Sequence, residues 1–254
     1  MLLALDAGNT NVTIGIFQGG VLVDHRRLRT VREQTSDEWG ILLMSLLRYA
    51  SLDPAEVHGI IVSSVVPPLN SALAEMAQRY FRVEAMFVTP KTDTGLTICY
   101  DNPWEVGADR IVNSVAALHK YGGPCVIVDL GTAITFDAVS ADSEYLGGII
   151  SAGIGISAEA LFNRTARLPL VDFRQPKNLI GTNTVSSMQS GLFYGAIGAI
   201  DGIIERLIRE LGPDTRTIAT GGQAQMIAGG SRYIRHVDEN LTLEGLRLIW
   251  ERRK

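Results

Sequence analysis

The chain has 254 residues, a length that suits one large domain or two domains of about 120 residues each. Apolar residues make up 46% of it and charged residues 20%, which is the balance of a globular protein with a full hydrophobic core. A net charge of −4 without a basic stripe argues against a nucleic-acid partner. The sequence has no uninterrupted apolar run of about 18 residues, so it predicts no membrane span.

The first half of the chain predicts three strands joined by tight turns. Residues 1–7 form a short apolar strand, and residues 11–17 alternate with the two-residue period of a strand, so the four residues between them make a hairpin. Two glycines at 19–20 predict a turn into a third strand at 21–29. After these strands we expect, in chain order, a helix that starts in 35–39, a strand at 59–66, a helix opened by Pro68, and a strand at 85–89.

A helix over 101–121 closes this half, with Asn102 as its cap and Pro103 at its first position. The second half then restarts with another set of hairpin-linked strands. It predicts strands at 124–130, 133–139, 143–152 and 217–220, a long helix at 184–211, a short helix after Gly222 and a terminal helix from Thr242. Small residues at 191, 195 and 198 predict that another element approaches the long helix closely.

The two halves therefore follow a similar order, which indicates an α/β protein with an internal duplication. The predicted boundaries are 1–122 and 123–254. The strongest sign of duplication is a pair of similar acidic turns. LLALDAGNTNVTIGIF starts at residue 2, VIVDLGTAITFDAV starts at residue 126, and their aspartates, Asp6 and Asp129, lie 123 residues apart.

Each acidic turn places a carboxylate beside exposed backbone amides, which suits a phosphate and its cation. Gly8 and Gly131 let the backbone approach an anion without a Cβ atom. Asp6 can hold Mg²⁺ through water, and Asp129 repeats the carboxylate on the other side. One such turn alone would be an ordinary loop, because Asp, Gly and Asn are common turn residues. Neutral donors surround both turns, at Asn9, Thr10, Asn11, Thr13 and Thr132.

The segment YDNPWEVGADR, residues 100–110, adds a carboxylate, Asp109, and a guanidinium group, Arg110, at the start of a helix. Asp109 could accept the proton of a substrate hydroxyl that attacks a γ-phosphate. Arg110 could bind either a substrate carboxylate or the transferred phosphate. An ordinary surface Asp–Arg pair is the alternative.

Together with DAGNT and VDLGTAITFD, the segments GGIISAGI, IGTNTVSSMQSGLFYG and YDNPWEVGADR resemble the type III pantothenate kinases, from residue 3 to about residue 222. This resemblance implies membership of the acetate and sugar kinase/actin superfamily. The implied fold is a duplicated actin-like (ribonuclease H-like) one, with two similar mixed-sheet halves flanked by helices and a cleft between them. The implied reaction transfers the γ-phosphate of ATP to the primary hydroxyl of pantothenate and gives 4'-phosphopantothenate, the first step of coenzyme A synthesis.

The resemblance also assigns residue roles. Asp109 would be the proton acceptor, Asp6 would hold the Mg²⁺ of ATP, and Asp129 would hold a monovalent cation, K⁺ or NH₄⁺. ATP would contact Asp6, Ala7, Gly8, Asn9, Thr10, Asn11, Val12, Thr13 and Thr132. Pantothenate would contact Tyr100, Gly107, Ala108, Asp109, Arg110 and Thr184.

The assembly and location are predicted as a homodimer in the cytoplasm. The helix at 184–211 is apolar on more than one face, as expected if one face meets the core and another a partner, although a fully buried core helix would look similar. Two cysteines without a C-x-x-C motif suit two buried thiols in a reducing compartment. Two functional alternatives stay open: a non-catalytic nucleotide-binding regulator, or another small-molecule kinase or a phosphatase of the superfamily.

Overall fold

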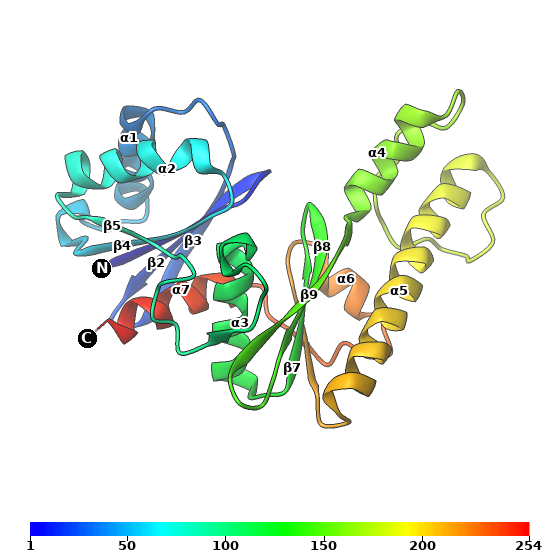
Figure 1. The fold of residues 1–254 in the computed structure, drawn as a ribbon. Helices are drawn as coiled ribbons and strands as arrows, with labels where there is room; N and C mark the ends of the chain where they lie inside the picture. The colour runs from blue at the N-terminus through cyan, green and yellow to red at the C-terminus, as the bar shows by residue number, and fades with distance from the viewer. Residues whose placement is uncertain (254) are drawn as a thin grey trace. The chain divides into compact units, whose positions relative to one another are not determined.

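A computed structural model describes residues 1–253, which fold into two compact units (Figure 1). Unit 1 contains residues 1–96, 100–116 and the chain from Leu241 onward, and unit 2 contains residues 97–99 and 117–240. A simple split after residue 122 differs from this division because helix α7 (Leu241–Arg252) returns to unit 1. There Trp250 packs on Gly59, where an added Cβ would lie 2.1 Å from the indole ring.

Unit 1 is built on a five-stranded mixed sheet in the order β3-β2-β1-β4-β5. The first three strands are antiparallel neighbours, and β4 and β5 run parallel to β1. Helices α1 and α2 cover one face around the buried Trp39 and Leu69, while α7 lies on the other face and α3 packs against α7 at Gly245. The elements are β1 (Leu2–Ala7), β2 (Asn11–Gln18), β3 (Val21–Arg29), β4 (Gly59–Ser64), β5 (Ala85–Phe87), α1 (Ser36–Tyr49), α2 (Pro67–Met76) and the part of α3 (Ala108–Tyr121) up to residue 116.

Unit 2 is built on a six-stranded mixed sheet in the order β11-β10-β7-β8-β9-β6. One face of this sheet packs on α4, α5 and α6 through a separate hydrophobic core that includes Phe136 and Phe193. The elements are β6 (Thr97–Ile98), β7 (Cys125–Leu130), β8 (Ala133–Val139), β9 (Glu144–Ala152), β10 (Arg216–Thr220), β11 (His236–Val237), α4 (Ile154–Arg164), α5 (Thr184–Leu211) and α6 (Ala224–Ala228).

The two units repeat one topology, which confirms the predicted duplication of the fold. The order β3-β2-β1-β4-β5 recurs in unit 2 as β9-β8-β7-β10-β11. Strands β1 and β7 share one burial pattern, and their fifth residues, Asp6 and Asp129, are partly exposed between buried neighbours. Both hairpin pairs even shift register at a similar place, after Ile16 in β2 and after Ala138 in β8.

Four local predictions are corrected by the structure. The predicted helix at 101–121 is interrupted: Asn102 caps only a short 3₁₀ turn, and α3 starts after Gly107. Helix α2 begins at Pro67 rather than at Pro68. Cys99 is exposed, whereas Cys125 is buried in β7, and burial raises the pKa of its thiol to about 12. The fourth correction concerns the glycines of α5, where no other element of the described chain lies within 4 Å of an added Cβ.

Helix α4 was missed because glycines lie before and at its start, at residues 147, 148, 153 and 155, and because Gly153 occupies the cap position without a side chain that could cap the helix. Within residues 1–253, no helix has the length and apolar character that crossing a membrane requires.

Candidate active site

The first acidic turn is a closed hairpin that is also tied to the end of β3. The Gly8 amide donates to the Asn11 carbonyl at 3.0 Å, which closes the turn. Thr30 then holds the turn from the side: its hydroxyl donates to the Gly8 carbonyl at 2.6 Å, and its amide donates to the Thr10 carbonyl at 3.0 Å. The backbone of the turn is therefore fixed before any ligand binds.

The side chains of this turn separate into two groups. Asp6 lies opposite Thr13 in the β1–β2 ladder, so both project from the same face of the sheet. Ala7 and Val12 are fully buried in the hydrophobic core, so only their backbone atoms are available to a ligand. The remaining side chains at the tip, Asn9 and Thr10, are exposed.

The neighbouring strand β4 brings the segment around residue 107 to the same edge of unit 1. The Val65 amide donates to the Ala7 carbonyl at 3.1 Å, directly beyond β4. The Val65 side chain lies 3.5 Å from the position that a Cβ on Gly107 would take. The acidic turn and the start of α3 thus meet at the carboxyl ends of β1 and β4, within one unit.

Asp109 occupies the first turn of α3 with its carboxylate folded back over the helix start. Its Oδ1 accepts a 2.8 Å hydrogen bond from the Arg110 amide. The same oxygen lies 2.5 Å from the position of a Cβ on Gly107, so any side chain at residue 107 would force the carboxylate to move. Burial raises the pKa of Asp109, whereas the Arg110 amide and the Arg110 charge oppose the shift. A partly desolvated carboxylate is the form in which an aspartate serves best as a proton acceptor near neutral pH.

The other predicted substrate residues of unit 1 flank this carboxylate in the chain. Arg110 is buried, with 7% of its surface exposed, and Tyr100 is partly buried. Ala108 is buried as well, so it would meet a ligand through its backbone alone.

The second acidic turn, in unit 2, has a comparable construction. The Gly131 amide donates to the Ala133 carbonyl at 3.1 Å and closes the turn after Asp129. Gly221, at the end of the neighbouring strand β10, has a φ of +92° and lies against the carboxylate of Asp129. A Cβ at Gly221 would come within 2.7 Å of Oδ1 of Asp129 and 2.8 Å of the Leu130 carbonyl oxygen. Thr132, at the tip, is exposed.

The oxygen atoms at both turns fit the cations that an ATP-dependent enzyme would use. Mg²⁺ prefers oxygen ligands and keeps several waters, so the single carboxylate of Asp6 beside a phosphate-sized turn fits it. At the second turn, the carboxylate of Asp129 and the carbonyl of Leu130 converge on Gly221, and a side chain there would fill the space between them. This hard oxygen environment fits a monovalent cation.

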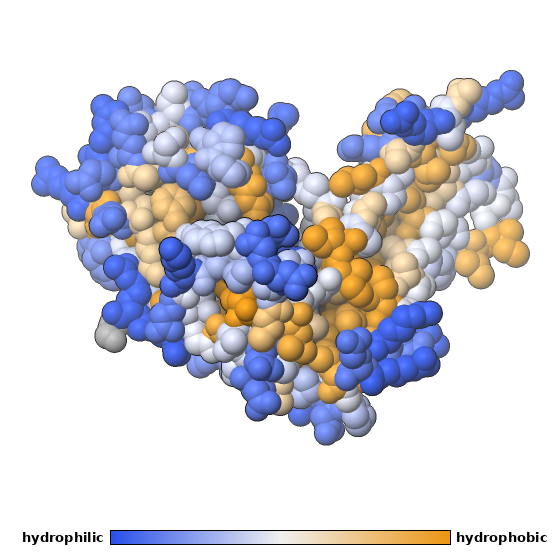
Figure 2. Space-filling model, viewed as in Figure 1, coloured by the Kyte–Doolittle hydropathy of each residue, from blue (hydrophilic) through white to orange (hydrophobic). Residues whose placement is uncertain are grey.

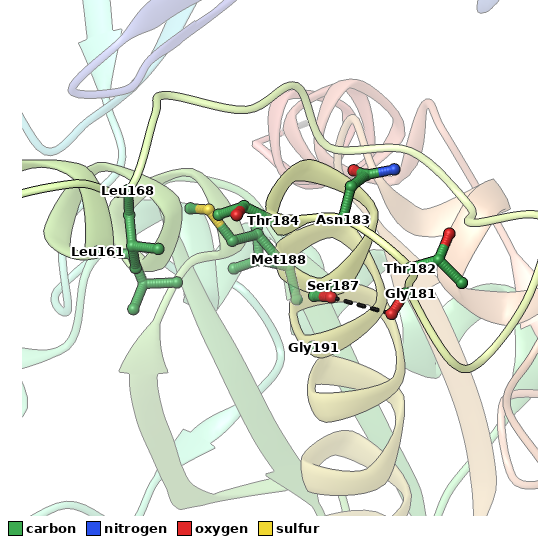
Figure 3. A pocket seen from close by; sticks show the side chains of 10 residues that line it. Leu161, Leu168, Gly181, Thr182, Asn183, Thr184, Ser187, Met188 and Gly191 are labelled. Atoms are coloured by element: carbon green, nitrogen blue, oxygen red, sulfur yellow. Dashed lines mark hydrogen bonds between the residues drawn. The ribbon is translucent and has the colours of Figure 1, made fainter.

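Thr184 lies elsewhere in unit 2, at the exposed first position of α5 (Figure 3). It lines an open groove of about 700 Å³ between α4 and the start of α5. The side chain of Asn183 caps α5 by accepting from the Ser186 amide, and the Ser187 hydroxyl donates to the Gly181 carbonyl. These bonds fix the loop that carries Thr184.

The structure thus brings Asp6, the turn at 8–13 and Asp109 together in unit 1. Asp129 and Thr132 share a second turn in unit 2, and Thr184 lies on a separate groove there. Sequence reasoning missed Thr30, Ser63 and Gly221. Ser63 lies opposite Asp6 in β4, is fully buried, and its hydroxyl has no hydrogen-bond partner within residues 1–253. The glycine pair after β10 was the only sequence signal for any of the three.

The chain is similar to known proteins in sequence and in fold. Residues 2–206 match the sequence profile of the family described as type III pantothenate kinase. A type III pantothenate kinase from Solibacter usitatus is 68% identical over 252 residues, which cover 99% of this chain and 97% of that protein. Two solved structures also align along nearly the whole chain. Component A of the (R)-2-hydroxyglutaryl-CoA dehydratase from Acidaminococcus fermentans has a TM-score of 0.54 at 11% identity and covers 100% of this chain and 99% of its own.

The second solved structure, a Baf family transcriptional activator from Campylobacter jejuni, has a TM-score of 0.59 at 19% identity, with 99% and 98% of the two chains covered. At such identities the likeness concerns the fold alone. Together with the repeated sheet order, it confirms the predicted actin-like class.

Proposed function

The chain belongs to the type III pantothenate kinase family and is an ATP-dependent pantothenate kinase; on this premise, we propose that Asp109 is its proton acceptor and that the two acidic turns bind ATP and its cations. The observation that carries the proposal is the position of the Asp109 carboxylate. Gly107 admits it at the carboxyl ends of β1 and β4, beside the turn at 8–13.

In the proposed mechanism, the chain positions the reactants and moves one proton. The amides and hydroxyls of the turn at 8–13 hold the phosphates of ATP, and Thr132 is a further proposed contact of ATP. Tyr100, Arg110 and Thr184 hold pantothenate. Asp109 accepts the proton of the primary hydroxyl as its oxygen attacks the γ-phosphorus. Asp6 would hold Mg²⁺ and Asp129 would hold K⁺ or NH₄⁺, and the bound cations would neutralise charge on the phosphate oxygens.

The two alternative functions are not favoured. A regulator that only binds nucleotide needs no proton acceptor, yet Asp109 places a carboxylate with a burial-raised pKa at the start of α3. The likeness to a transcriptional activator stands at 19% identity, against 68% to a pantothenate kinase.

We also propose a cytoplasmic location, because neither Cys99 nor Cys125 is in a disulfide, as expected in a reducing compartment.

The function is tested by measuring ADP release with pantothenate and with a panel of sugars and short-chain acids, each with and without potassium. We expect turnover with pantothenate and much slower release with the other acceptors. Potassium is expected to increase the rate with pantothenate, and sodium is the matched control. Faster turnover of a sugar than of pantothenate would contradict the substrate assignment, and equal rates in sodium and potassium would contradict the role of Asp129.

We further propose that the enzyme is a homodimer in which α5 meets α5 of a second copy. One face of α5 is exposed and consists of small residues and one aromatic: Gly191, Tyr194, Gly195, Gly198 and Ala199. An apolar groove of about 350 Å³ runs beside this face, and hydrophobic residues gather over α5 and β9 (Figure 2). Such a surface suits close packing of a second helix better than contact with water. The exposed apolar residues of this region include Leu146, Ile149, Ile150, Ile156, Leu161 and Phe162.

A charge on this face is expected to disrupt the dimer. The variant Gly195→Glu should be a monomer at concentrations where the wild type is a dimer, because the carboxylate would be buried without a partner. Light scattering after size exclusion measures the mass directly. The control is Ile41→Glu, the same charge at an apolar position that is 63% exposed on α1 in unit 1. A monomeric wild type, or a dimeric Gly195→Glu variant, would rule out this interface.

A further inference from the structure

Two arginines of β3 lie in register with the first acidic turn. In the ladder, Asp6 pairs with Thr13 and Thr13 pairs with Arg27, so the three form one row across the sheet. Arg29 pairs in the same way with Asn11. Residues opposite one another in adjacent strands project from the same face, so both arginines stand on the face that carries Asp6. Neighbouring strands are about 5 Å apart, which puts the Cα of Arg27 roughly 10 Å from that of Asp6.

The residues between and before these arginines face the other way. Leu28 packs against the hydrophobic core of unit 1, as expected for the alternate face of the strand. Arg26 also points to that face and forms a 2.9 Å ion pair with Asp24. The next residue along, Thr30, holds the turn through its bonds to Gly8 and Thr10. The backbone that carries Arg29 is therefore attached directly to the turn.

Arg27 and Arg29 carry their positive charges at the surface of β3. Both residues are exposed, and within residues 1–253 neither forms an ion pair. Cations on β3 could serve only to protect the open edge of the sheet from pairing with another chain. Such protection would work equally well on either face, however, and here the paired cation lies on one face and the two unpaired cations on the other. Two fixed positive charges beside a turn that binds phosphate produce a field that attracts a polyanion.

We propose that Arg27 and Arg29 form an additional wall of the nucleotide site that binds the polyphosphate of ATP. This proposal rests on the placement of ATP at the first acidic turn. The guanidinium group keeps its charge at all relevant pH values and offers several donors in a planar fork that matches phosphate oxygens. The wall gives the site selectivity for triphosphate over monophosphate, because a nucleoside monophosphate lacks the charges that the two arginines bind.

The test compares Arg27→Gln, Arg29→Gln and the double variant with a matched control, Arg26→Gln. All of these changes remove charge on the same strand, but Arg26 lies on the opposite face. Isothermal titration calorimetry gives the affinities for ATP and AMP, and steady-state kinetics gives kcat and both KM values. We expect each single change to weaken ATP binding by roughly tenfold and the double change by more, as for loss of charge-assisted hydrogen bonds. Affinity for AMP and the KM for pantothenate should not change.

The following results complete the test. Lysine at either position should recover part of the ATP affinity, because it restores charge without the planar fork. An ATP affinity of the double variant equal to that of the wild type would overturn the proposal, as would an equal loss of ATP affinity in Arg26→Gln or an equal loss of AMP affinity in the double variant. Wild-type enzyme that binds AMP as tightly as ATP would overturn the selectivity. Failure of the wild type to bind ATP at all would instead overturn the underlying nucleotide site.

Discussion

Replacing Asp109 with asparagine is expected to lower kcat by roughly 10²–10⁴-fold while ATP binding stays intact. The amide has nearly the same shape as the carboxylate but cannot accept the proton of the pantothenate hydroxyl. Steady-state assays would show the fall in kcat, and calorimetry would show the unchanged ATP affinity. Turnover at the wild-type rate would remove Asp109 from the mechanism.

The pH dependence gives this prediction a second readout. Burial raises the pKa of Asp109, so wild-type activity should fall with decreasing pH at a higher pH than an exposed aspartate would give. The raised pKa of Asp109 also affects stability, and here it favours low pH, whereas activity is favoured by high pH. A native pKa above the unfolded one means that the native state binds the proton more tightly, so this stabilisation is present at low pH and is lost as pH rises through the native pKa. Asparagine cannot ionise, and Asp109→Asn should therefore gain stability relative to wild type between acidic and neutral pH.

Gly107→Ala provides a companion variant that keeps the carboxyl group of Asp109 but changes its position. Its new Cβ would stand 2.5 Å from Oδ1 of Asp109, so the carboxylate must rotate away. We expect a lower kcat with little change in ATP affinity, as in Asp109→Asn, but with the acidic limb of the pH profile retained. Wild-type kcat in Gly107→Ala would show that the position of this carboxylate is not critical.

Replacing Gly221 with alanine is expected to abolish activation by potassium. The added methyl group would lie 2.7 Å from Oδ1 of Asp129 and 2.8 Å from the Leu130 carbonyl oxygen, so it displaces the oxygens that would hold the cation. The glycine also has a φ of +92°, which costs an alanine roughly 1–2 kcal/mol. Rates with and without potassium measure the loss of activation. The melting temperature without potassium measures the backbone strain, and its rise on adding potassium measures cation binding.

A matched control for backbone strain is available in the same unit. Gly212 ends α5 with a φ of +108°, and an added Cβ there meets nothing within 4 Å. Gly212→Ala should therefore lose a similar amount of stability but keep its response to potassium. Equal loss of the potassium response in both variants would show that the effect comes from general destabilisation. A normal potassium response in Gly221→Ala would contradict the proposal that Asp129 holds the cation.

Much of the fold could be predicted from the sequence because its signals are local. The strands around Asp6 and Asp129 have a two-residue period and glycine turns, and the structure places β8 and α5 at the predicted residues. The 123-residue repeat gave the duplicated topology as well. The break before α3 was not predicted, because the cap at Asn102 looks the same whether it starts a single turn or a whole helix.

The candidate site shows the same division. The sequence by itself determined which side chains carry charge, and it determined that two acidic turns are built alike, because residue type and turn chemistry are properties of a few consecutive residues. Only the tertiary structure decided that α7 returns to unit 1, that Ser63 lies opposite Asp6, and that Arg27 shares a row with Asp6. Those relations join residues far apart in the chain through strand register and packing, and no local pattern of residues specifies them.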